Sequence, residues 1–169
     1  MKKKYELTEE TIEVNGRILH RIKAVRDFGC VKAGDLGGFI QKEENLSIEG
    51  NSWVYGDAKV YGDAKVYDDA KVYGDAKVYD DAKVYGDARV CGDAEIKNNT
   101  DYIVFKNFWS SGRFFTWTRS NNMWKVGCFY GTGEELIKKA YEDSKKSGRE
   151  YERVVRYVES ILADERKEE

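Results

Sequence analysis

Residues 54–95 read VYGDAK-VYGDAK-VYDDAK-VYGDAK-VYDDAK-VYGDAR-VCGDAE, one six-residue unit repeated seven times without a gap. Valine stands first in every unit and alanine fifth, so the apolar period is six, unlike the period of about 3.6 in a helix or 2 in a strand. A β-solenoid explains this period, with valine pointing inward from a short strand and alanine pointing inward near a tight corner. Gly or Asp at position three, followed by Asp, suits a turn because both residues tolerate positive φ. We therefore expect a stack of coils in which each unit packs only on its neighbours.

The repeat resembles the hexapeptide-repeat family of left-handed parallel β-helices, in which an aliphatic residue is followed four positions later by a small one. This resemblance implies left-handed triangular coils of three hexads each. The register extends backwards through IEGNSW, with Ile48 at position one and Ser52 at position five, and further to Leu36, Ile40 and Leu46. The sequence thus predicts a mainly β protein with a short parallel β-helix of about three coils at residues 36–100, and the resemblance implies that this helix is left-handed.

Stacked coils would place tyrosines in columns, since residues one coil apart lie roughly 4.8 Å from each other. Tyrosines exposed on all three faces would form a sizeable aromatic surface. Because hexapeptide-repeat proteins usually trimerise side by side, the resemblance implies a homotrimer; the alternative is that the tyrosines only pair along the strands of a monomer. The expected interface residues are Tyr55, Tyr61, Tyr67, Tyr73, Tyr79 and Tyr85. Aspartates would stack in the same way, either as plain turn residues or as a weak cation site.

Segments of different character flank the repeat. At residues 1–35 we expect a β-hairpin that caps the first coil, because Asn15-Gly16 is a strong two-residue turn signal between residues 11–14 and 17–24. Residues 101–169 predict an α+β domain of the type β-β-β-α-α. Its strands are expected at residues 102–105, 113–119 and 124–129, with a turn at Asn121-Asn122.

Two helices are expected to complete this C-terminal domain. Thr132 and Glu135 have the spacing of a capping box, which predicts the start of the first helix. Gly148 is predicted to end the connection to the second helix. The second helix carries one apolar face, made of Tyr151, Val154, Val155, Val158, Ile161 and Leu162.

The whole chain resembles a set of uncharacterised proteins from bacteria, phages and prophages. These share a segment like VKAGDLGGFIQKEENLS (residues 31–47), V-Y-(G/D)-(D/N)-A-(K/R) hexads and a GCF-x-GT motif, here Gly127-Cys128-Phe129-Tyr130-Gly131-Thr132. Their pattern has Gly-Ser-Arg before the second C-terminal strand. Here the order is Ser111-Gly112-Arg113, so only the arginine corresponds. The resemblance implies a phage or prophage origin and carries no established activity.

The GCF-x-GT segment is the candidate ligand or partner site. Cys128 is either a packed strand residue or a thiol near a helix start. Gly131 and Gly133 are either a plain turn or an anion cradle that Arg113 would complete. Ten aromatic residues among residues 101–130 exceed what a small core needs, which favours an aromatic pocket or patch. The candidate residues are Arg113, Cys128, Phe129, Tyr130, Gly131, Thr132, Trp109 and Trp117.

Composition narrows the function classes. The net charge of −2 argues against nucleic-acid binding. Three cysteines and the single histidine His20 are too few for a zinc site, so neither a metal nor a cofactor is expected. The start MKKKYELTEE has no apolar stretch behind it, and no run is long enough to cross a membrane, so we expect a cytoplasmic protein without membrane partners, in the bacterial host cytoplasm if it is phage-encoded.

Three functions follow as hypotheses. The first is a non-enzymatic trimeric binding or scaffold module, whose partner is a host protein or a small anionic ligand such as a nucleotide signal. The second is an acyl- or acetyltransferase of the hexapeptide-repeat class, for which His20 is the histidine available. The third is a structural or virion component. The regular coils contain no inserted loop, and catalysis needs irregular residues, so the first hypothesis is preferred.

Overall fold

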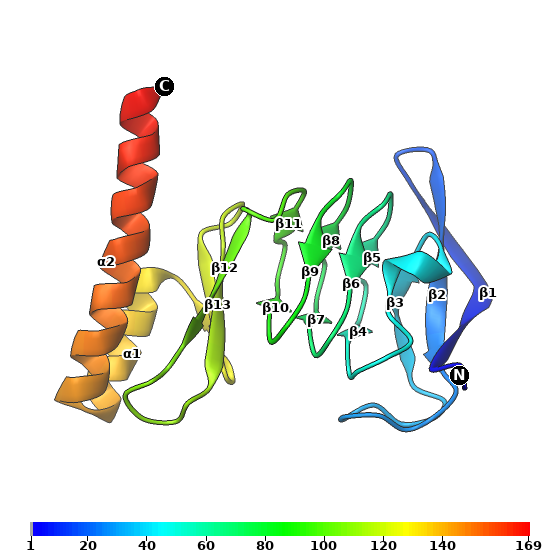
Figure 1. Cartoon of the computed structure of the whole chain (residues 1–169), viewed down its shortest axis with the longest axis horizontal. Helices are drawn as coiled ribbons and strands as arrows, with labels where there is room; N and C mark the ends of the chain where they lie inside the picture. Colours follow the sequence, from blue (N-terminus) through cyan, green and yellow to red (C-terminus); the bar gives the residue numbers. More distant parts are fainter. Residues whose placement is uncertain (1) are drawn as a thin grey trace.

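The computed structural model describes residues 2–169 and shows a β-solenoid of about three turns between two end units (Figure 1). A hairpin lies at one end of the solenoid, and an antiparallel sheet backed by two helices lies at the other. Among the described residues, no helix is both long and apolar enough to span a membrane.

Each hexad forms one two-residue strand whose second residue is the inward valine. Strands one coil apart pair in parallel, as Val54 with Val72 and Val72 with Val90. Every valine and alanine of the repeat is fully buried, which confirms the predicted inward set. The strands are β4 (Trp53–Val54), β5 (Lys59–Val60), β6 (Lys65–Val66), β7 (Lys71–Val72), β8 (Lys77–Val78), β9 (Lys83–Val84), β10 (Arg89–Val90) and β11 (Glu95–Ile96).

The N-terminal hairpin continues one face of the solenoid. Strands β1 (Tyr5–Val14) and β2 (Arg17–Ala24) are joined at the predicted Asn15-Gly16 turn. Strand β3 (Leu36–Ile40) pairs antiparallel with β2 and parallel with β5, giving one sheet in the order β1-β2-β3-β5-β8-β11. Gly37 and Gly38 allow this contact, because a Cβ at either position would lie within 2.6 Å of a solenoid carbonyl oxygen.

The first coil is longer than the predicted register. Ile40 lies opposite Val60 and Leu46 opposite Val66, whereas Val54 lies opposite Val72, so two extra residues sit between Leu46 and Val54. The prediction that Ile48 points inward is therefore wrong, and Ile48 is 39% exposed in the widened corner. Leu36 is also exposed, while Ser52 is buried as predicted. The 3₁₀ helix η1 (Glu43–Asn45) precedes this corner.

The C-terminal sheet has four strands where the sequence predicted three. A turn at Gly127, with φ +55°, divides the predicted third strand in two. The sheet order is β12-β13-β14-β15. Its strands are β12 (Tyr102–Lys106), β13 (Phe114–Thr118), β14 (Met123–Val126) and β15 (Phe129–Gly131).

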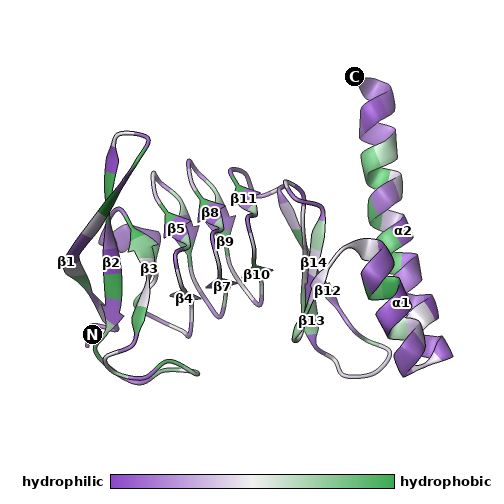
Figure 2. Cartoon of the chain, turned by 180° about the vertical axis from the view of Figure 1, so that it is seen from behind, coloured by the Kyte–Doolittle hydropathy of each residue, from purple (hydrophilic) through white to green (hydrophobic). Residues whose placement is uncertain are grey.

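Helices α1 (Gly133–Asp143) and α2 (Lys145–Glu168) lie on the side of this sheet that faces away from the solenoid (Figure 1). Polar and apolar segments alternate along α2, as expected for a helix with one buried stripe (Figure 2). The predicted capping box is confirmed, since Thr132 accepts from the Glu135 amide and Glu135 accepts from the Thr132 amide. Gly148 does not end the connection as predicted; it lies inside α2, where a Cβ would approach the Tyr141 ring to 2.3 Å.

Candidate functional site

The C-terminal sheet and the loops that adjoin it cover the last coil of the solenoid and supply hydrogen-bond acceptors to it. In the coils below, the first amide of each strand donates to an alanine carbonyl of the next coil, and the last coil has no next coil. Its three strands instead donate their first amides to side-chain oxygens: Lys83 to Asn99 Oδ1, Arg89 to Thr116 Oγ1 and Glu95 to Ser120 Oγ. The cap thereby satisfies backbone donors that would otherwise template another strand.

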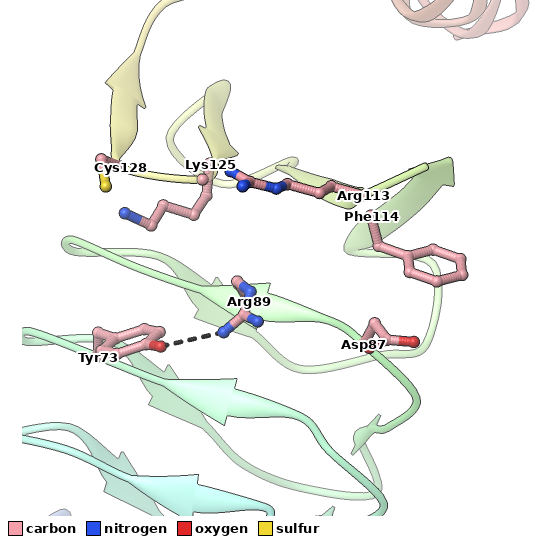
Figure 3. A pocket seen from close by; sticks show the side chains of 8 residues that line it. Tyr73, Asp87, Arg89, Arg113, Phe114, Lys125 and Cys128 are labelled. Carbon is pink, nitrogen blue, oxygen red and sulfur yellow. Dashed lines mark hydrogen bonds between the residues drawn. The ribbon is translucent and has the colours of Figure 1, made fainter. Parts of the chain in front are cut away.

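A cleft of about 490 Å³ lies between this cap and one face of the solenoid. Arg89 and Tyr73 come from the solenoid side, whereas Arg113 and Lys125 come from the cap (Figure 3). The remaining lining residues are Asp87, Phe114, Gly127 and Cys128. The volume falls in the range of roughly 300–1,000 Å³ that is common for small-molecule sites.

The cleft is basic. Arg89, Arg113 and Lys125 line it together with a single carboxylate, Asp87. Within residues 2–169, none of these three cations forms an ion pair with a carboxylate. By contrast, Arg119 of the same cap pairs with Glu165. The positive charge of the cleft is thus left for a ligand or for solvent.

Local contacts set the positions of two of the cations. Arg89 Nη1 donates to the Tyr73 hydroxyl at 3.2 Å, a bond drawn in Figure 3. Burial raises the pKa of Tyr73, and the Arg89 charge opposes that shift. A Cβ on Gly127 would lie 3.6 Å from Arg113 Nη1, so the glycine turn lies directly against the guanidinium. Guanidinium groups suit phosphate and carboxylate because their planar donors match two oxygens at once.

An irregular hexad lies beside the cleft. Cys91 takes the position that tyrosine holds in the other units. The Tyr55–Tyr73 column therefore has a cysteine where a third tyrosine would stand. Burial raises the pKa of Cys91 to about 11, while the charges of Lys125 and Arg89 act to lower it, which places both cations near the thiol.

The structure separates most of the predicted site residues. Arg113 and Cys128 line the cleft. Cys128 was expected either as a packed strand residue or as a thiol at a helix start, and both expectations are wrong. It is exposed, in the turn between β14 and β15, and strand β15 separates it from α1.

The aromatic candidates serve the packing of the C-terminal unit. Trp109 and Trp117 are buried in the core between the sheet and the helices, with Phe129 packed against that core. The Trp117 indole donates to Asn122. The Tyr130 ring covers Gly92 at a corner of the last coil, where a Cβ would collide with it.

The anion cradle predicted at the start of α1 is occupied by the chain itself. The Glu135 carboxylate accepts from the Thr132 amide at 2.8 Å and reaches the Gly131 backbone. Gly133 packs against Val155 of α2. These contacts fill the helix start, so Gly131 and Thr132 have a structural role.

The tyrosine columns are confirmed as stacks. Ring centroids of Tyr55–Tyr73, Tyr61–Tyr79 and Tyr67–Tyr85 lie 4.7, 5.3 and 5.2 Å apart, with nearly parallel planes. The expectation of exposure on all three faces is wrong for one column, because the hairpin covers Tyr61, which is only 4% exposed. Only the other two tyrosine columns therefore remain for the predicted homotrimer interface. In the described part of the chain, no group of three or more His, Cys, Asp or Glu side chains gathers as a metal site.

Arg89, Lys125, Tyr73, Asp87 and Phe114 were not predicted as members of a ligand site. One signal was present in the sequence. Arg89 and Cys91 are departures from the repeat, and they fall together in its last units. A residue that departs from the repeat indicates a position where a requirement other than the stacking of coils determines the residue type.

No family model matches the chain. Part of the chain is similar to the uncharacterised acetyltransferase YdcK of Escherichia coli (strain K12), with 39% identity over 61 residues. The similar region is 31% of this chain and 19% of that protein, so the chain covers only a minor part of this relative. The comparison is thus a partial similarity between a β-solenoid protein and a protein named as an acetyltransferase.

Proposed function

We propose that this protein is a non-enzymatic binding module that holds a small anion, a phosphate or a carboxylate, in the basic cleft. The observation that carries the proposal is the convergence of Arg89, Arg113 and Lys125 with no ion-pair partner among the described residues. Three neighbouring cations repel one another, and an anion that bonds to them relieves that repulsion.

The way the cleft is built supports binding. Arg89 stands on the solenoid, whose coils are held by parallel strand pairing, and Tyr73 orients its guanidinium. Arg113 and Lys125 stand on the cap, which is bonded to the last coil through Thr116 and Ser120. A rigid frame of this kind holds charged groups in place before the ligand arrives, which lowers the entropic cost of binding.

The lining residues favour binding over catalysis. Among residues 2–169, no histidine lines the cleft, so the exposed Cys128 thiol has no imidazole there to act as its base. His20 lies on β2 of the hairpin, at the other end of the solenoid, where its Nδ1 is 3.2 Å from the Thr8 carbonyl oxygen.

Isothermal titration calorimetry of the full chain with inorganic phosphate, sulfate and acetate tests the proposal. We expect one anion per cleft, with an affinity that falls as salt rises because the interaction is electrostatic. Arg113→Gln should weaken binding by about tenfold or more, as a charge-assisted hydrogen bond is lost. Arg149→Gln, which changes an exposed arginine of α2, should leave binding unchanged. Absence of binding for all three anions, or equal binding by both variants, would refute the proposal.

The similarity to YdcK favours acyl transfer as a second candidate function. If it applied here, His20 would be the histidine available as a general base. The test is an assay with acetyl- and longer acyl-CoA donors on the full chain and on His20→Ala. Activity that His20→Ala abolishes would establish the acyltransferase, whereas inactivity of both forms would remove it.

A further inference from the structure

A second cleft, of about 440 Å³, adjoins the basic one. The two clefts share the lining residues Asp87 and Phe114, so they lie next to each other. Apart from these two residues and Gly86, the second cleft is lined by Tyr85, Asn99, Tyr102, Ile103 and Val104.

The second cleft has the character of a ring-binding site. The rings of Phe114 and Tyr85 are 39% and 46% exposed, which leaves aromatic surface open to solvent in a chain that buries most of its apolar side chains. Tyr102 is held by its hydroxyl, which donates to the Lys83 carbonyl at 2.8 Å. Flat aromatic rings pack well on such surfaces.

Asn99 adds a polar group to this cleft. Its Oδ1 accepts from the Lys83 amide, and that bond orients the side chain. Within residues 2–169 its amide nitrogen makes no hydrogen bond, so both of its donors are free for the edge of a heterocyclic ring.

Asp87 stands at the wall that the two clefts share. Figure 3 shows its side chain beside Phe114, apart from Lys125 and Cys128. In the described part of the chain, this carboxylate forms no side-chain hydrogen bond and no ion pair, although three cations line the same cleft. An ionised carboxylate only accepts hydrogen bonds, so it disfavours a bare anion beside it and favours a neutral hydroxyl group.

From this order of groups we infer that the two clefts together bind a nucleoside phosphate. The phosphate lies among Arg89, Arg113 and Lys125, the sugar hydroxyls donate to Asp87, and the base lies against Phe114 and Tyr85 in reach of Asn99. The inference rests on the proposed anion site and specifies its ligand. A flat ring, a hydroxyl-bearing link and an anionic group are needed in that order, and a nucleotide has all three.

The first test compares inorganic phosphate with adenosine 5′-monophosphate by calorimetry on the full chain. We expect the nucleotide to bind at least about tenfold more tightly, because base stacking adds to the phosphate contacts. Tyr85→Ala, at a ring that lines the second cleft and not the basic one, should weaken nucleotide binding roughly fivefold or more and leave phosphate binding unchanged. Phe108→Ala, at a ring that is 78% exposed and lines neither cleft, is the matched control and should change neither affinity.

The second test uses Asp87→Ala, whose effects on the two ligands should have opposite signs. Removal of the carboxylate should tighten phosphate binding, since a repelling charge is lost, and should weaken nucleotide binding, since the acceptor for the hydroxyls is lost. Thermal unfolding of each variant shows that it is folded. Phosphate binding without any gain for the nucleotide would overturn this inference and leave the anion site standing. Loss of phosphate binding itself would overturn both.

Discussion

At the residue scale, the third position of each hexad decides how tightly the coils turn. All seven residues at this position have positive φ, from +53° at Asp80 to +67° at Gly62. This confirms the prediction that Gly or Asp would adopt the left-handed region here. Asp68 and Asp80 accept a conformation that costs most residues about 1–2 kcal/mol, and Asp is among the residues that tolerate it best.

Two glycines of the repeat form a matched pair for measuring this cost. Gly86→Ala should destabilise the protein by about 1–2 kcal/mol through backbone strain alone, because no atom of residues 2–169 lies within 4 Å of the added Cβ. Gly62→Ala should cost more, since its Cβ would lie 3.1 Å from the Asp80 nitrogen and 3.3 Å from the Asp80 oxygen. Urea denaturation followed by circular dichroism measures both. Equal losses for the two variants would show that the contact with the next coil has no effect.

At the element scale, the cap provides the hydrogen-bond acceptors that another coil would provide for the last coil. Thr116 comes from the face of the sheet that meets the solenoid and Ser120 from the turn after β13, whereas Phe115 and Trp117 point to the helices. This alternation is the period of two expected of a strand with different environments on its two faces. At the other end, Asn45 donates to the carbonyls of Gly62 and Ala64, so both solenoid ends are covered by side-chain hydrogen bonds. Covered ends speak against end-to-end stacking of solenoids into a virion spike.

Thr116→Val tests the cap directly. The variant keeps the shape of a residue that is 1% exposed but removes the acceptor of the Arg89 amide. We expect a loss of about 1–3 kcal/mol in the free energy of unfolding, because a buried donor is left unpaired. Thr11→Val makes the same chemical change at an exposed position of β1 and should be nearly neutral. A Thr116→Val protein as stable as wild type would show that solvent replaces the lost bond.

At the scale of the whole molecule, buried tyrosines make stability depend on pH in the alkaline range. Burial raises the pKa of Tyr55 and of Tyr102 to about 12, above the ordinary value of about 10. Below pH 10 both the folded and the unfolded chain keep the proton. Between about pH 10 and 12 the unfolded chain releases it and the folded chain does not, so stability is lost as pH rises.

The expected result is a free energy of unfolding that decreases from pH 10 upwards, measured by urea denaturation at a series of pH values. Tyr55→Phe should make the decrease shallower, because one of the buried groups with a raised pKa is removed. Tyr157→Phe, at a ring that is 58% exposed on α2, should leave the slope unchanged. The buried Lys4 works in the opposite direction at lower pH. Burial lowers its pKa to about 8, so its contribution increases stability as pH rises from about 8.

The homotrimer and the phage or prophage origin stay predictions. Coverage of Tyr61 by the hairpin limits a side-by-side interface to the faces that carry Tyr55–Tyr73 and Tyr67–Tyr85. Of these residues, Tyr73 and Tyr85 also line the two clefts. A side-by-side trimer through these columns would therefore form next to the two clefts.

The sequence by itself determined the features that depend on local chemistry or on a repeated spacing. The period of six predicted the inward valines and alanines, Asn15-Gly16 predicted the hairpin turn, and Thr132 with Glu135 predicted the start of α1. Each of these features depends on residues within a few positions of one another, or on an identical neighbour one coil away.

Only the tertiary structure decided where the cap sits, and with it the site. Arg89 and Arg113 are brought to one cleft because the cap follows the hydrogen-bonding needs of the last coil, and no local pattern encodes that contact. The tertiary structure also decided the widened corner before Val54 and the burial of Tyr61. Both depend on how the hairpin and the first coil pack on the solenoid. A repeat specifies its own stacking, but what covers its ends depends on complementary surfaces that are distant in the chain.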